Sequence, residues 1–288
     1  MAGIKAPSEP DVVQIRRLVL TAIASDDDLL ASLVLKGGNA LRMVYRLVQR
    51  TTLDLDFSME DEFSDARTAA DKLFGVLRRN FSDVGLVMFD ETLVERPRVV
   101  PFGGNPRHGG YHARFKIIER EFDEILKHDD LQRRKYRHRT YEIDISKYEY
   151  CEGKQMVPVA GSVAIYVYTP LMIVLEKLRA LCQQMPAYPY RANPSPRPGD
   201  FYDIHMVLER TRLQLGEHGD LLRHIFDAKE VELSLLAYLP ETREFHRSEW
   251  EKVVLGAPTA GSFDEHFDYV IERVKPLQAL WIEESPSF

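Results

Sequence analysis

Hydrophobic positions in the first half of the chain follow helical and strand periods in turn. Residues 12–23 are apolar at the spacing of one helical face, and Asp11 precedes them as a candidate N-cap. The apolar residues 33–35 predict a short strand, after which residues 40–48 have the pattern of a helix. Ser64 is expected to cap a further helix. This half of the chain should therefore contain both kinds of element.

Further segments of this half alternate apolar and polar residues, as strands with one buried face do. The predicted strands comprise residues 53–58, 85–89, 111–118, 140–146 and 163–168. Strands and helices that alternate along a chain indicate an α/β or α+β domain with a mixed sheet, and we assign the α+β class.

The second half of the chain changes to helical spacing. Thr169 is a good N-cap, and Pro170 suits the first position of a helix with a continuous apolar stripe. The five prolines of residues 186–198 predict a loop, and helical patterns then continue almost to the end. We therefore expect two domains, residues 1–168 with the sheet and residues 169–288 with helices.

Charge is unevenly distributed along the chain. The 288 residues carry a formal net charge of −7, which argues against a protein that coats DNA. From Arg96 to Arg139, however, 12 Lys and Arg residues stand against 6 Asp and Glu residues. Residues 132–139 combine arginines with aromatic side chains, which suits contact with phosphates and bases. A solvated basic surface is the simpler alternative.

The remaining composition is that of an ordinary globular protein, with 44% hydrophobic and 29% charged residues. No apolar run approaches the roughly 20 residues that span a bilayer. The first ten residues lack the pattern of a secretion signal. Cys151 and Cys182 have no metal-binding spacing, and we expect them to be buried free thiols in a reducing cytoplasm.

Asp54 and Asp56 alternate with apolar residues in the predicted strand 53–58, so both carboxylates should project from one face. Two neighbouring carboxylates repel each other unless a cation lies between them. Mg²⁺ accepts one or two protein carboxylates together with substrate phosphates, and Mn²⁺ prefers similar ligands. The pair therefore predicts a metal site, with a chance pair on a surface strand as the alternative.

A turn with two glycines precedes these aspartates, in the sequence Lys36-Gly37-Gly38-Asn39. Paired glycines let the backbone approach a ligand closely, and the N-terminus of the following helix presents N–H groups to phosphate. A plain strand-to-helix turn that needs a positive φ angle is the alternative. A phosphate-binding turn followed by paired carboxylates suits chemistry on a nucleoside triphosphate.

A third carboxylate would complete a site for two metal ions. Glu142 and Asp144 lie on the same face of the predicted strand 140–146, and either could come beside Asp56. We prefer Asp144 because two isoleucines flank it and should place it centrally in the sheet. An edge strand with an exposed acidic face is the alternative.

Four short motifs stand in order along the chain. Residues 37–42 read Gly-Gly-Asn-Ala-Leu-Arg, and residues 50–58 read Arg-Thr-Thr-Leu-Asp-Leu-Asp-Phe-Ser. Residues 176–181 read Glu-Lys-Leu-Arg-Ala-Leu, and residues 197–203 read Arg-Pro-Gly-Asp-Phe-Tyr-Asp. In identity and order these motifs resemble those of the AbiEii/AbiGii family of nucleotidyltransferases.

The resemblance implies a DNA-polymerase-β-like catalytic domain followed by a helical domain that completes the active site. It also implies the toxin of a type IV toxin–antitoxin pair, whose antitoxin is encoded as a separate protein. Relatives of this kind transfer nucleotides, often pyrimidines, from a nucleoside triphosphate to the 3′ end of tRNA and so block translation.

The residues and the resemblance together give the candidate site. The catalytic candidates are Asp54, Asp56, Asp144, Lys177 and Asp200, of which the first three would bind the metal. The nucleotide-binding candidates are Lys36, Gly37, Gly38, Asn39, Arg50 and Arg197. Lys177 would neutralise the triphosphate, although a lysine that extends from a buried helix is the simpler interpretation of its position. Asp200 would position Lys177 or act on the attacking hydroxyl, and Asp203 would be structural.

Other functions are compatible with parts of this pattern. Transfer of a nucleotide to a protein or a small molecule would use the same carboxylates but not the basic stretch. A non-catalytic protein with the same fold would need neither the carboxylates nor Lys177. A zinc hydrolase would need a helical histidine pair, and two glycines between His108 and His112 interrupt such a helix.

Overall fold

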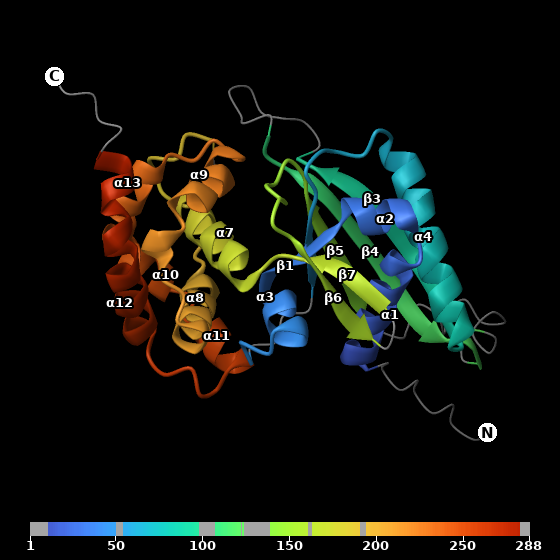
Figure 1. Cartoon of the computed structure of the whole chain (residues 1–288). Helices are drawn as coiled ribbons and strands as arrows, with labels where there is room; N and C mark the ends of the chain where they lie inside the picture. The colour runs from blue at the N-terminus through green and yellow to red at the C-terminus, as the bar shows by residue number, and fades with distance from the viewer. Residues whose placement is uncertain are drawn as a thin grey trace.

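The computed structural model describes residues 11–49, 54–97, 107–121, 123, 139–160, 163–190 and 194–282. Figure 1 shows a twisted sheet with helices α1, α2 and α4 on one side of the molecule. Helices α7 to α13 form a second group on the other side, and α3 lies between the two groups. The mixed sheet and the helical second half confirm the predicted α+β class.

The sheet has seven strands in the order β3-β4-β5-β2-β1-β7-β6. Their bounds are β1 Val34–Lys36, β2 Leu55–Ser58, β3 Leu86–Arg96, β4 Gly110–Glu119, β5 Thr140–Ser146, β6 Gln155–Ala160 and β7 Val163–Val167. The pairs β1–β7 and β2–β5 are parallel, and the other neighbours are antiparallel. The short central strands β1 and β2 therefore have neighbours on both sides, and β1 is buried along its whole length.

Two strands differ from the prediction. Strand β6 was not predicted, because Pro158 interrupts its apolar pattern; proline is tolerated here since β6 lies at the edge of the sheet. Strand β3 continues to Arg96 instead of ending at Phe89. Asp90 adopts a positive φ of 53° beside a shift in the β3–β4 register, so the chain forms a bulge and then resumes pairing.

The helices that cover the sheet begin at aspartate caps. In α1 (Val12–Ala24) the Asp11 carboxylate accepts a hydrogen bond from the Val13 N–H at 3.0 Å, as predicted. Helix α2 spans Asp27–Ser32. The predicted cap of α4 (Ala66–Asp83) was wrong by one residue. Asp65, and not Ser64, accepts the Thr68 N–H at 2.7 Å, because the capping oxygen must reach the third residue of the helix.

The helix predicted for residues 40–48 begins and ends earlier in the structure. Helix α3 (Gly37–Asn39) begins directly at the glycines and continues as the single wide turn η1 (Ala40–Val44), in which the Tyr45 N–H bonds to the Ala40 carbonyl at 3.2 Å. Arg46 then adopts a positive φ of 56°, which an α-helix does not allow. The helix therefore ends at Val44.

The second half is helical, as predicted. Its elements are α7 Pro170–Cys182, α8 Pro198–Thr211, η2 Leu215–Glu217, α9 Gly219–Asp227, η3 Leu233–Thr242, α10 Arg243–Arg247, α11 Trp250–Gly256, α12 Phe263–Val274, η4 Lys275–Gln278 and α13 Ala279–Ile282. The Thr169 hydroxyl caps α7 by accepting the Met172 N–H at 3.2 Å, and Pro170 is the first helical residue. Both features were predicted.

Most buried hydrophobic residues form one large cluster, which extends from Ile15 to Leu277 and includes residues of the sheet and of α7; Ile118 packs separately with Val87 and Phe89. Cys151 and Cys182 are buried free thiols, as predicted. Within the described ranges, every helix is too short or too polar to cross a membrane. The division into two domains at residue 168 stays a prediction.

Candidate active site

Three neighbouring strands place Lys36, Asp56 and Asp144 in one row across the sheet. Lys36 is the partner of Asp56 in the β1–β2 register, and Asp56 is the partner of Asp144 in the parallel β2–β5 register. Asp54 lies directly before β2. The structure therefore brings Asp144 beside Asp56, as we preferred, and leaves Glu142 two residues earlier on β5.

The glycine turn is fitted against one of these aspartates. Gly37 has a φ of +69°, which side chains rarely adopt. A Cβ atom at this position would lie 3.1 Å from the Asp56 Cβ atom and would collide with the Asp56 carboxylate. The two alternatives for this turn therefore coincide: Gly37 supplies a positive φ, and it also allows a close approach.

Asn39 contacts the other aspartate. Its side-chain amide is fully buried and donates a hydrogen bond to the backbone carbonyl of Asp54. We had expected Asn39 among the nucleotide-binding residues. The structure directs its side-chain amide to Asp54, and a contact of Asn39 with the nucleotide stays a prediction. Gly38 is likewise buried within the turn.

Nearby positive charge does not compensate for the burial of the Asp54 and Asp56 carboxylates, so their pKa values are raised. Burial raises the pKa of Asp56 to about 6, since the attraction of Lys36 offsets burial only in part and Asp144 adds repulsion. Burial also raises the pKa of Asp54, and Glu142 and Asp144 act in the same direction. A cation bound among these carboxylates would relieve the repulsion.

The donor set fits a hard divalent cation, because it consists of carboxylate oxygens whose ionised forms are destabilised without one. The ligands would be Asp54, Asp56 and Asp144. In the described parts of the chain, no three His, Cys, Asp or Glu side chains already converge as a metal site would require. Binding an ion would therefore require some rearrangement of these side chains.

His112 belongs to this acidic cluster and was not predicted there. It lies on β4 opposite Asp144, and its Nδ1 atom is 2.6 Å from Asp144 Oδ1. Its Nε2 atom is 3.7 Å from a carboxylate oxygen of Glu142. Gly109 and Gly110 precede His112 and exclude a helix there, as we argued, and strand β4 begins at Gly110. Alternation along the predicted strand 111–118 places His112 on one face with Arg114 and Lys116, but its contact with Asp144 depends on pairing with β5, which local spacing does not show.

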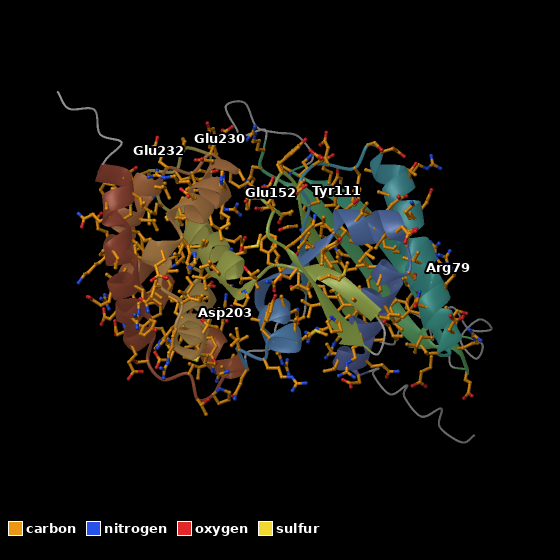
Figure 2. All side chains as sticks on the ribbon, viewed as in Figure 1. Arg79, Tyr111, Glu152, Asp203, Glu230 and Glu232 are labelled. Atoms are coloured by element: carbon orange, nitrogen blue, oxygen red, sulfur yellow. The ribbon has the colours of Figure 1, made fainter. Side chains whose placement is uncertain are left out.

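The opposite wall of the site comes from α7 and α8. The Lys177 ammonium lies 2.5 Å from Asp200 and 3.0 Å from Asp203, and all three side chains are at most 6% exposed. Figure 2 labels Asp203 on α8. Asp203 is fully buried and shares the Lys177 ammonium with Asp200, and its structural role stays a prediction. Lys177 is thus held by two carboxylates and is not an isolated lysine at the edge of an apolar stripe.

Arg197 binds the second carboxylate oxygen of Asp200, the one that Lys177 does not contact. Its Nε atom donates to Asp200 Oδ2, and its backbone N–H donates to His246 Nδ1 at 2.9 Å. Burial alone would raise the pKa of Asp200, but the charges of Arg197 and Lys177 hold it well below its usual range. The Arg197 side chain is 37% exposed and lines a cavity of about 250 Å³ at the start of α8.

Some predicted residues lie outside the described parts of the chain. Arg50 is among them, as are residues 98–106 and 124–138 of the basic stretch. The candidate residues that the structure describes come from two sides of the site, which we call its two walls. The sheet contributes carboxylates and the glycine turn, and α7 with α8 contributes the ion-paired Lys177 and Arg197.

Comparisons with known proteins bear on the family and the fold of the chain. Residues 18–272 match the family described as nucleotidyl transferase AbiEii toxin, type IV TA system. The solved structure of MenT4, a nucleotidyltransferase toxin from Mycobacterium tuberculosis H37Rv, is 14% identical, with 93% of this chain and 82% of that chain covered and a TM-score of 0.52.

A protein from H. pylori assigned as a nucleotidyltransferase is 15% identical over 96% of this chain and 97% of its own, with a TM-score of 0.44. No curated protein matches the sequence. The likeness to MenT4 shows the fold, and the family match covers most of the chain. This chain therefore belongs to the AbiEii family of nucleotidyltransferase toxins of type IV toxin–antitoxin systems.

Proposed function

We propose that this nucleotidyltransferase transfers a nucleotide from a nucleoside triphosphate to the 3′ hydroxyl of an RNA, with tRNA as the acceptor. The observation that carries the proposal is the adjacency of Asp56 and Asp144 in register, with Gly37 fitted against the Asp56 carboxylate. Paired carboxylates beside a phosphate-binding turn support phosphoryl transfer chemistry, in which positioning and charge stabilisation supply most of the catalysis.

Asp54, Asp56 and Asp144 would bind Mg²⁺ or Mn²⁺, and the bound metal would supply the positive charge that stabilises the attacking and leaving oxygens. Asp144 would accept the proton of the attacking hydroxyl. His112, at 2.6 Å, would hold the Asp144 carboxylate in place for this role. Asn39 would fix the backbone of Asp54.

The backbone N–H groups at the start of α3 would bind the phosphates of the nucleotide, because the first N–H groups of a helix have no partner within it. Lys177 and Arg197 would supply positive charge from the opposite wall. Among the described residues, Asp200 is the ion-pair partner of the Arg197 guanidinium and is bound through Nε, so the outer N–H groups suit a phosphate. Arg50 stays a candidate on sequence grounds.

Two further observations support RNA as the acceptor and a toxic role. The stretch from Arg96 to Arg139 has a surplus of 6 positive charges in a chain of net charge −7, which favours contact with a polyanion. MenT4, which shares the fold, is a nucleotidyltransferase toxin. We therefore also propose that the protein acts on tRNA in the cytoplasm, blocks translation, and is neutralised by a separately encoded antitoxin.

The test is to incubate the protein with tRNA, Mg²⁺ and each labelled nucleoside triphosphate in turn. We expect labelled tRNA, no labelling in excess EDTA, and a loss of at least about a hundredfold in Asp56→Ala. Asp71→Ala is the matched control, since Asp71 is exposed on α4, and it should label as wild type does.

Absence of labelling with all four nucleotides, or equal labelling by Asp56→Ala, would contradict the proposal. Label that appears in a nuclease-resistant product from an RNA-free extract would instead favour a protein or small-molecule acceptor. Sequencing the 3′ ends of tRNA after expression identifies the added base.

A further inference from the structure

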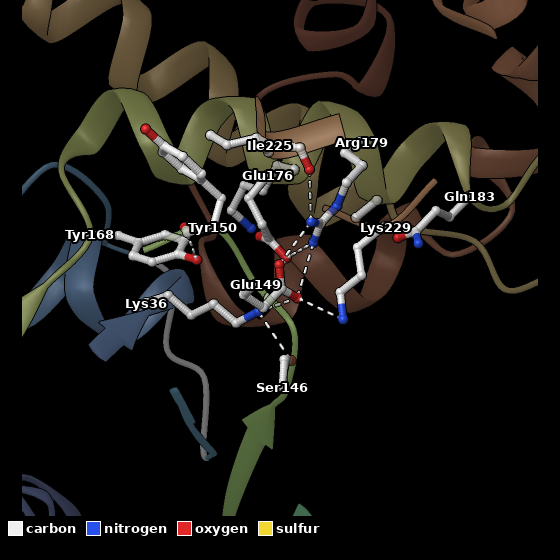
Figure 3. A network of polar contacts seen from close by, with 12 residues as sticks. Lys36, Ser146, Glu149, Tyr150, Tyr168, Glu176, Arg179, Gln183, Ile225 and Lys229 are labelled. Carbon is white, nitrogen blue, oxygen red and sulfur yellow. Dashed lines mark hydrogen bonds and ion pairs between the residues drawn. The ribbon is translucent and has the colours of Figure 1, made fainter. Parts of the chain in front are cut away.

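A buried ionic network lies between the sheet and α7, next to the candidate site (Figure 3). Its charged members are Lys36, Glu149, Glu176, Arg179 and Lys229, and each side chain is at most 14% exposed. Three cations therefore accompany two carboxylates. Buried charges are costly unless paired, so the contacts of each member show what it holds in place.

Lys36 enters this network from the sheet. Its ammonium is 3.1 Å from Ser146 Oγ, 3.4 Å from Glu176 and 3.5 Å from Glu149. These three oxygens match the three N–H donors of a lysine. Lys36 is the register partner of Asp56 and the residue before Gly37, yet its ammonium is directed to α7 and to the segment after β5.

The network continues from Glu176 into α7. Arg179 lies 3.4 Å from Glu176. Both of its terminal nitrogens donate hydrogen bonds to the Glu149 carboxylate, at 2.7 and 3.2 Å. It also donates to the Ile225 carbonyl of α9 at 3.1 Å. Arginine in this two-pronged geometry fixes orientation as well as distance. Helix α7 is thus joined to the β5 segment by Arg179 and to β1 by Glu176.

Glu176 immediately precedes Lys177 on α7. Successive residues of an α-helix point about 100° apart, so the two side chains face different neighbours. Glu176 faces Lys36 of the sheet, and Lys177 faces Asp200 of α8. The direction in which Lys177 projects therefore depends on how Glu176 is held.

We propose that Lys36 is a positioning residue that acts through Glu176 to fix the rotation of α7. In this way it sets the place of Lys177 relative to Asp56, its own neighbour in the sheet. This inference rests on the proposed function, in which Lys177 and Asp56 act on one nucleotide. It gives Lys36 a role other than direct binding of the triphosphate.

The test is a double-mutant cycle with Lys36→Met and Glu176→Gln, measured as kcat and as KM for the nucleotide. We expect each single change to lower kcat at least about tenfold and to leave KM within about twofold. The double variant should be no slower than the worse single variant, because both changes break one contact. Lys36→Arg, which keeps the charge, should recover most of the lost kcat.

A KM that rises tenfold or more in Lys36→Met, or effects that multiply in the double variant, would overturn the inference and make Lys36 an independent nucleotide contact. Lys36→Met should fold, since Arg179 and Lys229 still balance the two carboxylates. Lys229→Met is the matched control. It removes another buried cation of the network, which contacts Glu149 at 3.6 Å, and should lower stability without the loss of kcat. Equal losses of kcat in both variants would show a general packing effect.

Hydrogen exchange of α7 separates this inference from the proposed function. If wild type transfers no nucleotide to any acceptor, the proposed function fails, but the contact can still be tested. Lys36→Met and Glu176→Gln should each raise the exchange rate of the α7 amides at least about tenfold, and Lys229→Met should raise it less. Unchanged exchange in α7 would overturn the positioning role whatever the activity.

Discussion

At the scale of single residues, the candidate site depends on contacts between the glycine turn and the aspartates. The Asp56 carboxylate occupies the space that a Cβ atom on Gly37 would need, and the Asn39 amide donates a hydrogen bond to the backbone carbonyl of Asp54. Each aspartate is thus fixed by the turn that would bind the phosphates. Changes in the turn should therefore affect both the carboxylates and the nucleotide.

Gly37→Ala is expected to lower the free energy of unfolding by more than the roughly 1–2 kcal/mol that a left-handed residue costs, and to abolish transfer. The added Cβ atom must also displace the Asp56 carboxylate. Gly85→Ala is the matched control, because Gly85 has a φ of +76° with no atom within 4 Å of the new Cβ. Urea unfolding and tRNA labelling of both variants measure the difference; equal effects would contradict the close fit of Gly37 to Asp56.

The pKa of Asp56, raised by burial to about 6, makes stability depend on pH in a predictable direction. The folded protein holds this proton more tightly than the unfolded chain, so wild-type stability should fall as pH rises from about 4 to about 6. Asn cannot ionise. In EDTA, Asp56→Asn should therefore be more stable than wild type by up to about 3 kcal/mol at pH 8, with no advantage at pH 4.

Thermal unfolding at several pH values checks this prediction. Mg²⁺ should raise the midpoint of wild type at pH 8 and have little effect on Asp56→Asn. An Asp56→Asn variant that is less stable than wild type at pH 8 without metal would show that Asp56 is ionised at no cost.

At the scale of elements, α7 is the helix on which the two walls depend. It carries Glu176, Lys177 and Arg179, whose partners lie in the sheet, in α8 and in the segment after β5. Its first turn is fixed by the Thr169 cap. The start of α7 therefore contributes to stability, whereas its middle determines the geometry of the site.

Thr169→Ala should lower the free energy of unfolding by about 1 kcal/mol, because the Met172 N–H loses its acceptor. The transfer activity of the folded protein should stay within about twofold, since the ionic contacts lie further along α7. Thr169→Ser keeps the hydroxyl and is the control in urea unfolding. A stable Thr169→Ala variant that loses most of its kcat would contradict this separation.

The elements also show what the sequence allowed us to predict. Strand 140–146 and the caps Asp11 and Thr169 were predicted correctly, because local spacing and side-chain chemistry determine them. Strand β6 was missed because an edge strand with a proline has no clear alternation. The bulge at Asp90 depends on pairing with β4, which local periods do not show.

The site was predictable to a similar extent. Asp56 and Asp144 share a face of their strands by alternation, and the structure places them together. The ion pair of Lys36 with Glu176 joins residues 140 positions apart, and His112 meets Asp144 across 32 positions. No local pattern specifies such contacts, so Lys36 was assigned to the nucleotide and His112 was set aside.

At the scale of the whole molecule, one stretch of the chain is positively charged and the remainder is negatively charged. Residues 96–139 have a net charge of +6, so the remainder carries −13 to give the total of −7. A long anionic acceptor would be attracted to one part of the protein and repelled by the rest. Electrostatics should therefore orient the acceptor as well as attract it.

Arg133→Ala/Arg134→Ala should weaken tRNA binding at low salt about tenfold or more and reduce the slope of log affinity against log salt by about two. The KM for the nucleotide should not change. Arg67→Ala/Lys275→Ala removes the same charge at exposed positions elsewhere and should bind as wild type does. Filter binding across a salt series measures both. Equal loss in the two variants would show that the basic stretch is not the RNA contact.

The distance along the chain between the two walls has a consequence for how the toxin is made. The glycine turn and Asp56 emerge from the ribosome first. Glu176, which pairs with Lys36, is synthesised 140 residues later than Lys36. At roughly 5–20 residues per second, about 7–28 s of synthesis separate them. The growing chain would thus hold only half a site until α8 has emerged. A chain that terminates before α7 would lack the wall that carries Lys177 and Arg197, so we expect it to transfer no nucleotide.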